Sequence, residues 1–328
     1  MPGSGTSTLI DPDDYQASLD RVPLDLLLVT SRGEFKASVT SARLHHLYLL
    51  GSEEDFPRIA YVSLSPALVF VGFTGRSSPP IVWGGVELHP GEIMLHSRAE
   101  RFHQRTAGPC SWGLIGLVAA QFERYSETVT GKRLTAPAAG RVLWPAARHS
   151  GRLVRLFTQA CRLAQTRPKI LGHPEVARGL EQGIIHALMT CLQTNRTTPS
   201  GLAKQHHQRI LIRFEDMLAE RLGELLRISE LCALIGVNER TLRSCCAEFL
   251  GISPSRYVLL RRLKQARTAL RNADRATVSI GEIARACGFI ELGRFTRAYQ
   301  IVFGETPLTT LRRVPGSGPT SPIFADPA

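Results

Sequence analysis

The 328-residue sequence predicts an α+β protein with two domains, a β-rich domain first and an all-α domain last. In residues 34–118, short apolar runs alternate with Gly and Pro turns, which is typical of a β barrel or sandwich. In residues 201–313, apolar residues recur every three to four positions, the period of helices. Residues 1–22 and 314–328 are rich in Gly, Ser, Pro and Asp, and we expect both to be disordered.

Six apolar runs predict the strands of the first domain. Gly84-Gly85, Pro90-Gly91 and similar pairs separate them and mark turns. Many short strands at close spacing favour an antiparallel arrangement. The predicted strands are residues 47–50, 59–64, 68–73, 81–83, 93–95 and 112–118.

Two amphipathic helices are predicted in residues 119–194. Residues 151–165 place apolar side chains on one helical face, and residues 174–192 do the same with Pro174 at the start. These stripes exceed what a lone barrel needs, so we expect one helix to form a symmetric dimer interface. Residues 194–201 predict a linker, which would close a sensing and dimerisation domain of residues 23–200.

Composition narrows the function classes. The 40 Lys and Arg exceed the 28 Asp and Glu by 12, which favours a polyanionic partner such as nucleic acid. No apolar stretch approaches the roughly 20 residues of a membrane span, and the N-terminus lacks a signal-peptide core. The seven Cys form no C-x-x-C pair, so we expect no disulfide framework, metal site or cofactor, and a cytoplasmic location.

Residues 228–250 show the pattern of a helix-turn-helix unit. Ser229 is placed to cap a short helix that ends at Ile235. Gly236 occupies the turn, where a positive φ favours glycine. Asn238 can then cap a second helix over residues 239–250.

The same pattern recurs in residues 280–303. Ser279 and Glu282 form a capping box ahead of it. Each unit is followed by Gly-x-Ser/Thr-Pro, at residues 251–254 and 304–307, and one long helix over residues 254–272 joins the two. The small, turn and inward apolar positions of the first unit are Cys232, Gly236 and Leu242, and those of the second are Ala284, Gly288 and Phe295.

Residues 208–313 resemble the DNA-binding domain of AraC/XylS-type regulators. The run GFIELGRFTRAYQIVFGETP is most similar to the ethanolamine-operon regulator branch, since it has Leu-Gly-x-Phe where most members have Ser-x-Phe. The matching residues are Leu231, Gly236, Arg240, Leu242, Phe249, Gly251, Ser253, Pro254, Tyr257, Arg262, Leu263, Ala266, Ile283, Ala284, Gly288, Phe289, Phe295, Arg297, Phe303, Gly304 and Pro307.

The resemblance implies a sequence-specific transcription regulator, not an enzyme, with a variable and often cupin-like N-terminal barrel. It also implies an activator that binds double-stranded promoter DNA as a homodimer, contacts RNA polymerase and responds to a small-molecule effector. The cupin metal motif G-x5-H-x-H is absent. Two alternatives stay open: a cupin-type binding protein or enzyme with an accessory DNA-binding domain, and a non-specific architectural DNA binder.

The N-terminal residues of a recognition helix contact base edges in the major groove. Outward arginines are the strongest candidates, because Arg bound to guanine is the commonest specific contact. In residues 209–313, Lys and Arg exceed Asp and Glu by seven, as expected for phosphate contact, although the rest of the chain is also basic, with a surplus of five. The predicted DNA-contacting residues are Asn238, Arg240, Thr241, Arg243, Ser244, Glu291, Leu292, Arg294, Thr296 and Arg297.

Aromatic residues on the predicted strands either line an effector pocket or belong to the core. They are Tyr48, Phe70, Phe73, Trp83 and Trp112. The sequence shows no catalytic motif.

Three other features are expected to be structural. His89, His96 and His103 lack the spacing of a metal site. Cys246 is expected to belong to the helix core, with Cys245 as an incidental neighbour, and Glu53-Glu54-Asp55 is expected to be a solvated loop.

Overall fold

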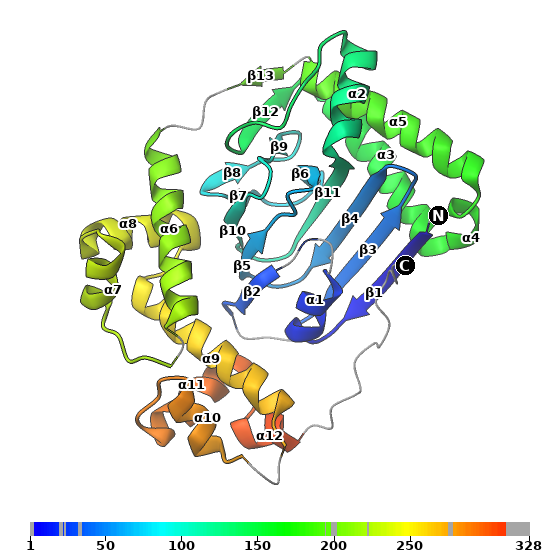
Figure 1. The fold of residues 1–328 in the computed structure, drawn as a ribbon. Helices are drawn as coiled ribbons and strands as arrows, with labels where there is room; N and C mark the ends of the chain where they lie inside the picture. The colour runs from blue at the N-terminus through cyan, green and yellow to red at the C-terminus, as the bar shows by residue number, and fades with distance from the viewer. Residues whose placement is uncertain are drawn as a thin grey trace.

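A computed structural model describes residues 3–312, apart from residues 20–21, 23, 32–34, 194, 198–201, 222 and 275–277. It confirms a β-rich N-terminal domain with trailing helices and a helical C-terminal domain (Figure 1). The predicted tail lies outside the described residues. Of the predicted linker, the structure describes only a short strand, β13 (Asn195–Thr197).

The strands form two antiparallel sheets. Sheet A has eight strands in the order β1-β3-β4-β11-β6-β9-β12-β13, and sheet B has five in the order β2-β5-β10-β7-β8. All six predicted strands are present. The remaining bounds are β1 (Gly3–Leu9), β2 (Leu24–Val29), β3 (Ala37–Arg43), β4 (Leu47–Glu54), β5 (Arg58–Ser63), β6 (Leu68–Thr74), β7 (Ile81–Trp83), β8 (Val86–Leu88), β9 (Ile93–Leu95), β10 (Arg101–Thr106), β11 (Cys110–Val118) and β12 (Arg141–Pro145).

The prediction that residues 1–22 are disordered is wrong. β1 pairs in full register with β3, and Asp11 caps helix α1 (Pro12–Ser18) by accepting a hydrogen bond from the Asp13 amide. Tyr15 on α1 is completely buried among the side chains between the two sheets. The polar composition of this segment concealed its order, because strand pairing satisfies the backbone whatever the side chains are.

A charged residue lies in the core between the sheets. The Glu54 carboxylate accepts hydrogen bonds from Tyr15 Oη at 2.5 Å, Trp112 Nε1 at 2.5 Å and Arg58 Nε at 2.6 Å. Of the predicted solvated loop, only Glu53 and Asp55 are exposed. Glu54 is buried because alternate residues of a strand face opposite sides of a sheet.

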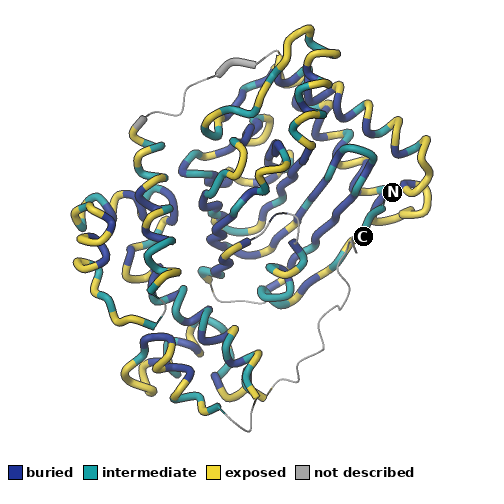
Figure 2. The backbone as a smooth tube through the Cα atoms, viewed as in Figure 1, coloured by how far each residue is buried: buried dark blue, intermediate teal, exposed yellow. Residues whose placement is uncertain are grey.

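Helices α2 (Ala119–Thr130), α3 (Ala147–Thr166), α4 (Pro168–Leu171) and α5 (Pro174–Gln193) cover the outer face of sheet A. Both predicted apolar stripes pack into this layer, and Figure 2 shows the buried residues on the inner sides of the helices. The stripes are therefore covered within one chain. This removes the reason given above for a dimer interface on α3 or α5, and dimerisation stays a prediction.

The C-terminal domain contains helices α6 (Leu202–Glu220), α7 (Ile228–Ile235), α8 (Glu239–Leu250), α9 (Pro254–Asn272), α10 (Ile280–Ala286), α11 (Leu292–Phe303) and α12 (Pro307–Arg312). Both helix-turn-helix units are present, and Gly236 adopts the expected positive φ of 75°. The predicted Ser229 cap is wrong. The cap lies two residues earlier, at Arg227, whose amide donates a hydrogen bond to the Glu230 side chain at 2.6 Å.

Candidate nucleic-acid interface

Each helix-turn-helix unit is fixed by its own small core. In the first unit, Leu231, Leu242 and Cys246 are buried between α7 and α8. In the second, Ala284 and Phe295 occupy the matching places between α10 and α11. The long helix α9 contributes to both cores, so it joins the two units directly.

The first recognition helix, α8, presents its N-terminal half to solvent. Asn238 Oδ1 caps it by accepting the Thr241 amide at 2.8 Å. Arg240, Arg243 and Ser244 are exposed, whereas Thr241 is half-buried. Arg243 Nη2 donates to Glu239 Oε2 at 2.8 Å, and no ion pair is found for Arg240 within the described part of the chain. The guanidinium of Arg240 is therefore free to contact a base edge or phosphate.

The second recognition helix, α11, presents a mixed surface. Glu291, Leu292, Arg294 and Arg297 are exposed and Thr296 is half-buried. Arg294 Nε lies 2.9 Å from Glu291 Oε2. The predicted contact residues therefore form two groups, one at the start of each recognition helix.

Sequence reasoning missed Ile290, which lies just before α11. Its side chain is 79% exposed, beside Leu292 at 48%. The signal was available, since two large apolar residues, Ile290 and Leu292, flank Glu291 immediately before a recognition helix. Such side chains suit contact with thymine methyl groups in the major groove.

The C-terminal domain packs on the outer face of sheet B. Leu26, Leu28 and Ile59 from β2 and β5 share a buried cluster with Phe214 of α6 and Phe249 of α8. α6 and α9 therefore lie beside the strands of sheet B (Figure 1). Thus α6 and α8 each serve both the DNA-binding domain and the domain junction.

A buried polar network crosses this junction. Glu215 on α6 accepts hydrogen bonds from Tyr257 and Arg261 of α9, and its Oε1 lies 2.8 Å from His103 Nε2 of β10. Burial alone would raise the pKa of Glu215. The hydrogen bond from His103 and the charge of Arg261 outweigh burial and lower the pKa of Glu215 below its ordinary value.

A second ionic contact joins α1 to α9. Arg271 Nη1 lies 2.7 Å from Asp11 and 2.9 Å from Asp13, and Arg267 Nη2 lies 2.8 Å from Asp11. Lys264 also pairs with Asp13. Burial raises the pKa of Asp13, but the charges of Lys264 and Arg267 outweigh it and lower the pKa. Part of the basic surplus of α9 therefore faces the N-terminal domain, not a phosphate backbone.

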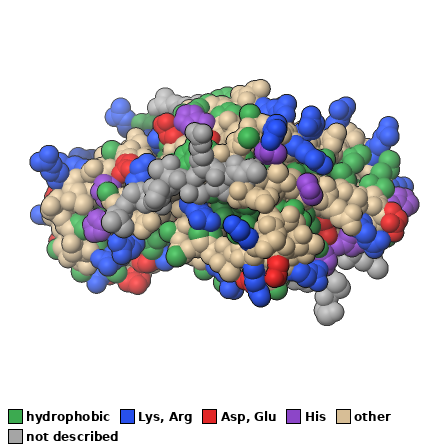
Figure 3. Space-filling model, turned by 90° about the horizontal axis from the view of Figure 1, so that it is seen from above, with side chains coloured by type: hydrophobic (Ala, Val, Ile, Leu, Met, Phe, Trp, Pro, Cys, Tyr) green, Lys and Arg blue, Asp and Glu red, His purple; other side chains and the backbone are tan. Residues whose placement is uncertain are grey.

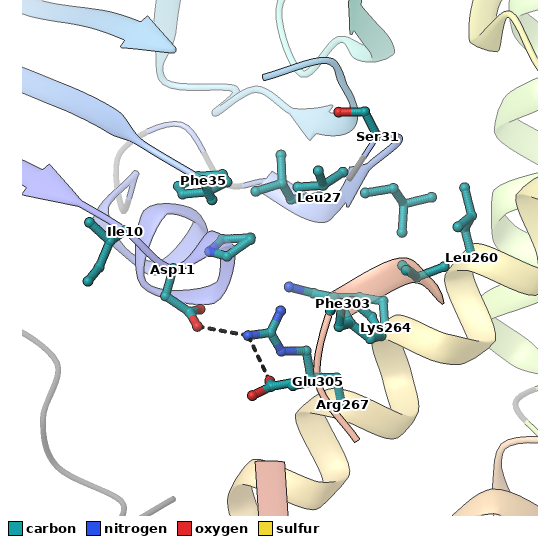
Figure 4. A pocket seen from close by; sticks show the side chains of 15 residues that line it. Ile10, Asp11, Leu27, Ser31, Phe35, Leu260, Lys264, Arg267, Phe303 and Glu305 are labelled. Atoms are coloured by element: carbon teal, nitrogen blue, oxygen red, sulfur yellow. Dashed lines mark hydrogen bonds and ion pairs between the residues drawn. The ribbon is translucent and has the colours of Figure 1, made fainter. Parts of the chain in front are cut away.

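A pocket of about 360 Å³ lies beside this contact and has walls from both domains (Figure 4). β2 and the residues around it supply Leu27, Leu28 and Phe35, while α9 and the end of α11 supply Leu260 and Phe303. The ionic side of the pocket consists of Asp11, Lys264, Arg267 and Glu305.

The structure does not bring the five predicted effector residues together. Phe70, Trp83 and Trp112 pack between the sheets. Phe73 faces the helical layer on the other side of sheet A, and Tyr48 is half-buried. Their role in effector binding stays a prediction.

Two of the three histidines that we expected to be structural, His96 and His103, lie beside carboxylates. His96 Nδ1 lies 2.9 Å from Glu100, as His103 lies beside Glu215. Cys245 and Cys246 are both buried. In the part of the chain that the structure describes, no three His, Cys, Asp or Glu side chains are grouped as a metal site, and no helix has the length and apolar character to cross a membrane.

Comparison with known proteins identifies the helical domain. A family profile described as a helix-turn-helix domain matches residues 231–313. The "Probable thc operon regulatory protein" of Rhodococcus erythropolis is 34% identical over 100 residues, which are 30% of each chain. The "XylDLEGF operon transcriptional activator" of Pseudomonas putida is 33% identical over 101 residues, 31% of this chain and 32% of that protein.

The C-terminal part of the chain is an AraC/XylS-type helix-turn-helix domain. The match to these curated relatives spans about a third of their length. Among solved structures, the AraC-like activator CuxR aligns with 81% of this chain and 96% of its own, at 16% identity and a TM-score of 0.41. An AraC-type regulator from Chromobacterium violaceum aligns with 33% of this chain and 93% of its own, at 29% identity and a TM-score of 0.30.

Proposed function

We propose that the protein is a transcription regulator that binds double-stranded DNA sequence-specifically with both recognition helices of the AraC/XylS-type domain. The observation that supports this most directly is the pair of exposed, N-terminally arginine-bearing helices, α8 and α11, joined by the single helix α9. Two such helices in one chain suit two successive major-groove segments, about one helical turn or 34 Å apart. The relatives named above are regulators, which favours this function over an enzyme.

Arg240→Ala tests specific recognition. We expect it to weaken binding to the specific site by about 1–3 kcal/mol and to leave binding to random DNA nearly unchanged, since base contacts specify and phosphate contacts do not. Gel-shift titration at one fixed salt concentration measures both affinities. The control is Arg178→Ala on α5, an exposed arginine paired with Glu175 on the N-terminal domain. Equal losses on both DNAs would assign Arg240 to phosphate contact, and no loss on either would remove it from the interface.

We also propose that a small-molecule effector controls DNA binding from the pocket between the domains. Its volume of about 360 Å³ is within the range of small-ligand sites, and its walls come from both domains. A ligand that fits only one relative placement of those walls shifts the population toward that placement. The apolar lining beside Lys264 and Arg267 suits a ligand with an apolar body and a polar end.

Val29→Phe adds a ring to the wall of this pocket and tests the site. A metabolite at 100 times its dissociation constant should stabilise the wild-type protein by about 2.7 kcal/mol. We expect that stabilisation, and any change in operator affinity, to be lost in Val29→Phe and retained in the control Val118→Phe, which is exposed at the junction of β11 and α2. The same response in both variants would place the effector elsewhere.

The partners beyond DNA follow from the same proposal. A regulator that activates transcription, as the Pseudomonas putida relative is named to do, acts on RNA polymerase in the cytoplasm. We propose that this chain does so as a homodimer. Light scattering of the full chain, with and without operator DNA, measures the assembly state.

A further inference from the structure

One segment of the N-terminal domain contains only basic charges. Residues 128–174 contain nine Lys and Arg and no Asp or Glu. Seven of the nine are arginines. The whole chain outside residues 209–313 has a surplus of only five positive charges, so this segment more than accounts for it.

The structure aligns four of these arginines on α3. Arg148, Arg152, Arg155 and Arg162 are exposed on the side of the helix opposite the buried Phe157. The first and last are fourteen helical steps apart, or about 21 Å at 1.5 Å per residue. We call these four residues the α3 arginine row.

No ion pair to a carboxylate is found for the α3 arginine row in the described parts of the chain, and Arg148 Nε donates a hydrogen bond to the neighbouring His149 ring at 3.1 Å. A fifth cation, Arg76, is tied to the start of the helix by a hydrogen bond to the Gly151 carbonyl at 3.1 Å. The face of the molecule seen from above in Figure 3 carries more Lys and Arg than Asp and Glu side chains.

We propose that the α3 arginine row binds the phosphate backbone of duplex DNA that flanks the site held by α8 and α11. This inference rests on the proposed function. A row of unpaired arginines suits phosphates because each guanidinium can donate two parallel hydrogen bonds to one phosphate. DNA already bound by the C-terminal domain is present at high effective concentration, so even weak phosphate contacts are occupied.

The arrangement of the layers adds a geometric requirement. α3 covers the face of sheet A, whereas α8 packs on sheet B (Figure 1). The α3 arginine row and the first recognition helix therefore lie over different sheets. The flanking DNA must bend toward the N-terminal domain, which duplexes do over sites of about 20–30 base pairs.

The test compares the wild type with a fourfold variant, Arg148→Gln, Arg152→Gln, Arg155→Gln and Arg162→Gln. Binding is measured at several salt concentrations on a specific site of about 20 base pairs, and on the same site extended by about 30 base pairs on each side. Each phosphate contact contributes about 0.9 to the slope of log Kobs against log salt. We expect the slope of the variant to be shallower by about 2–4 on the long fragment and unchanged on the short one.

A matched control removes four charges that already have partners within the chain. These are Arg43, which stacks on Tyr48, and Arg98, Arg124 and Arg178, each changed to Gln. The control should leave the slope on the long fragment unchanged. If the slope changed equally in the control and in the fourfold variant, net charge alone would explain the change, and the proposal would be overturned.

The remaining outcomes are decisive as well. If the fourfold variant has the wild-type slope on both fragments, the proposal is overturned. If that variant also loses transcription activation with RNA polymerase, the α3 arginine row would instead bind an acidic protein surface. If the wild type fails to distinguish the short specific site from random DNA, the proposed function fails instead. Melting temperatures equal to that of the wild type exclude misfolding.

Discussion

Glu215→Ala should lower the free energy of unfolding by about 3–5 kcal/mol and detach the DNA-binding domain from sheet B. Glu215 is 1% exposed and is shared by His103 of one domain and by Tyr257 and Arg261 of the other. Its removal leaves the partly buried Arg261 guanidinium without its counter-charge and the buried His103 and Tyr257 without their acceptor, and breaking a buried pair typically costs about 3–5 kcal/mol.

Chemical denaturation measures the loss, and hydrogen exchange of the β10 amides reports whether the junction opens. Glu220→Ala is the control, because Glu220 lies on the same helix and is exposed. Because the pKa of Glu215 is lowered in the folded protein, its contribution is complete above the unfolded value near 4.3 and is lost as the pH falls below it. If the free energy of unfolding of the wild type did not decline below this pH, and that of Glu215→Ala equalled the wild-type value, the role of this network would be refuted.

Glu54→Ala should have a comparable effect inside the β-rich domain, again about 3–5 kcal/mol. The variant would leave Arg58 buried and uncompensated and would remove the acceptor of Tyr15 and Trp112. Glu53→Ala is the matched control, because the neighbouring carboxylate is exposed on the other face of the same strand.

A double variant separates lost charge pairing from lost packing. Glu54→Leu with Arg58→Met replaces both charges by apolar groups of similar length, and such replacements of buried pairs are often neutral. We expect the double variant to be more stable than Glu54→Ala in urea denaturation. If the loss of unfolding free energy in the double variant equalled the sum of the losses in the two single variants, the polar network would have no pairing energy of its own.

The helical domain could be predicted closely from the sequence because its determinants are local. Gly236 adopts the positive φ that the turn requires, Asn238 caps α8, and the bounds of α8 and α9 and the end of α7 agree with the prediction. These features depend on residues three or four positions apart. The strands missed by sequence reasoning, such as β3 and β10, contain many polar residues and are defined by distant pairing partners.

The junction could not be predicted, because its charges have ordinary surface patterns in the sequence. Lys264, Arg267 and Arg271 lie on outward faces of a basic helix and resemble phosphate contacts. Their partners, Asp11 and Asp13, are about 250 positions away. Likewise, the predicted contact arginines lie where the pattern placed them, but their pairing with Glu239 and Glu291 depends on rotamers that spacing alone does not define.

The edge position of β1 limits where the protein can be cut. A truncated protein beginning at residue 23 would keep every residue of the interior strands but would expose β3 along its full length, since β1 is the strand that covers its outer edge among the residues that the structure describes. An uncovered strand edge pairs readily with another copy and leads to aggregation. Shortened forms for crystallisation or solution work should therefore retain residue 3 onward and place any affinity tag before it.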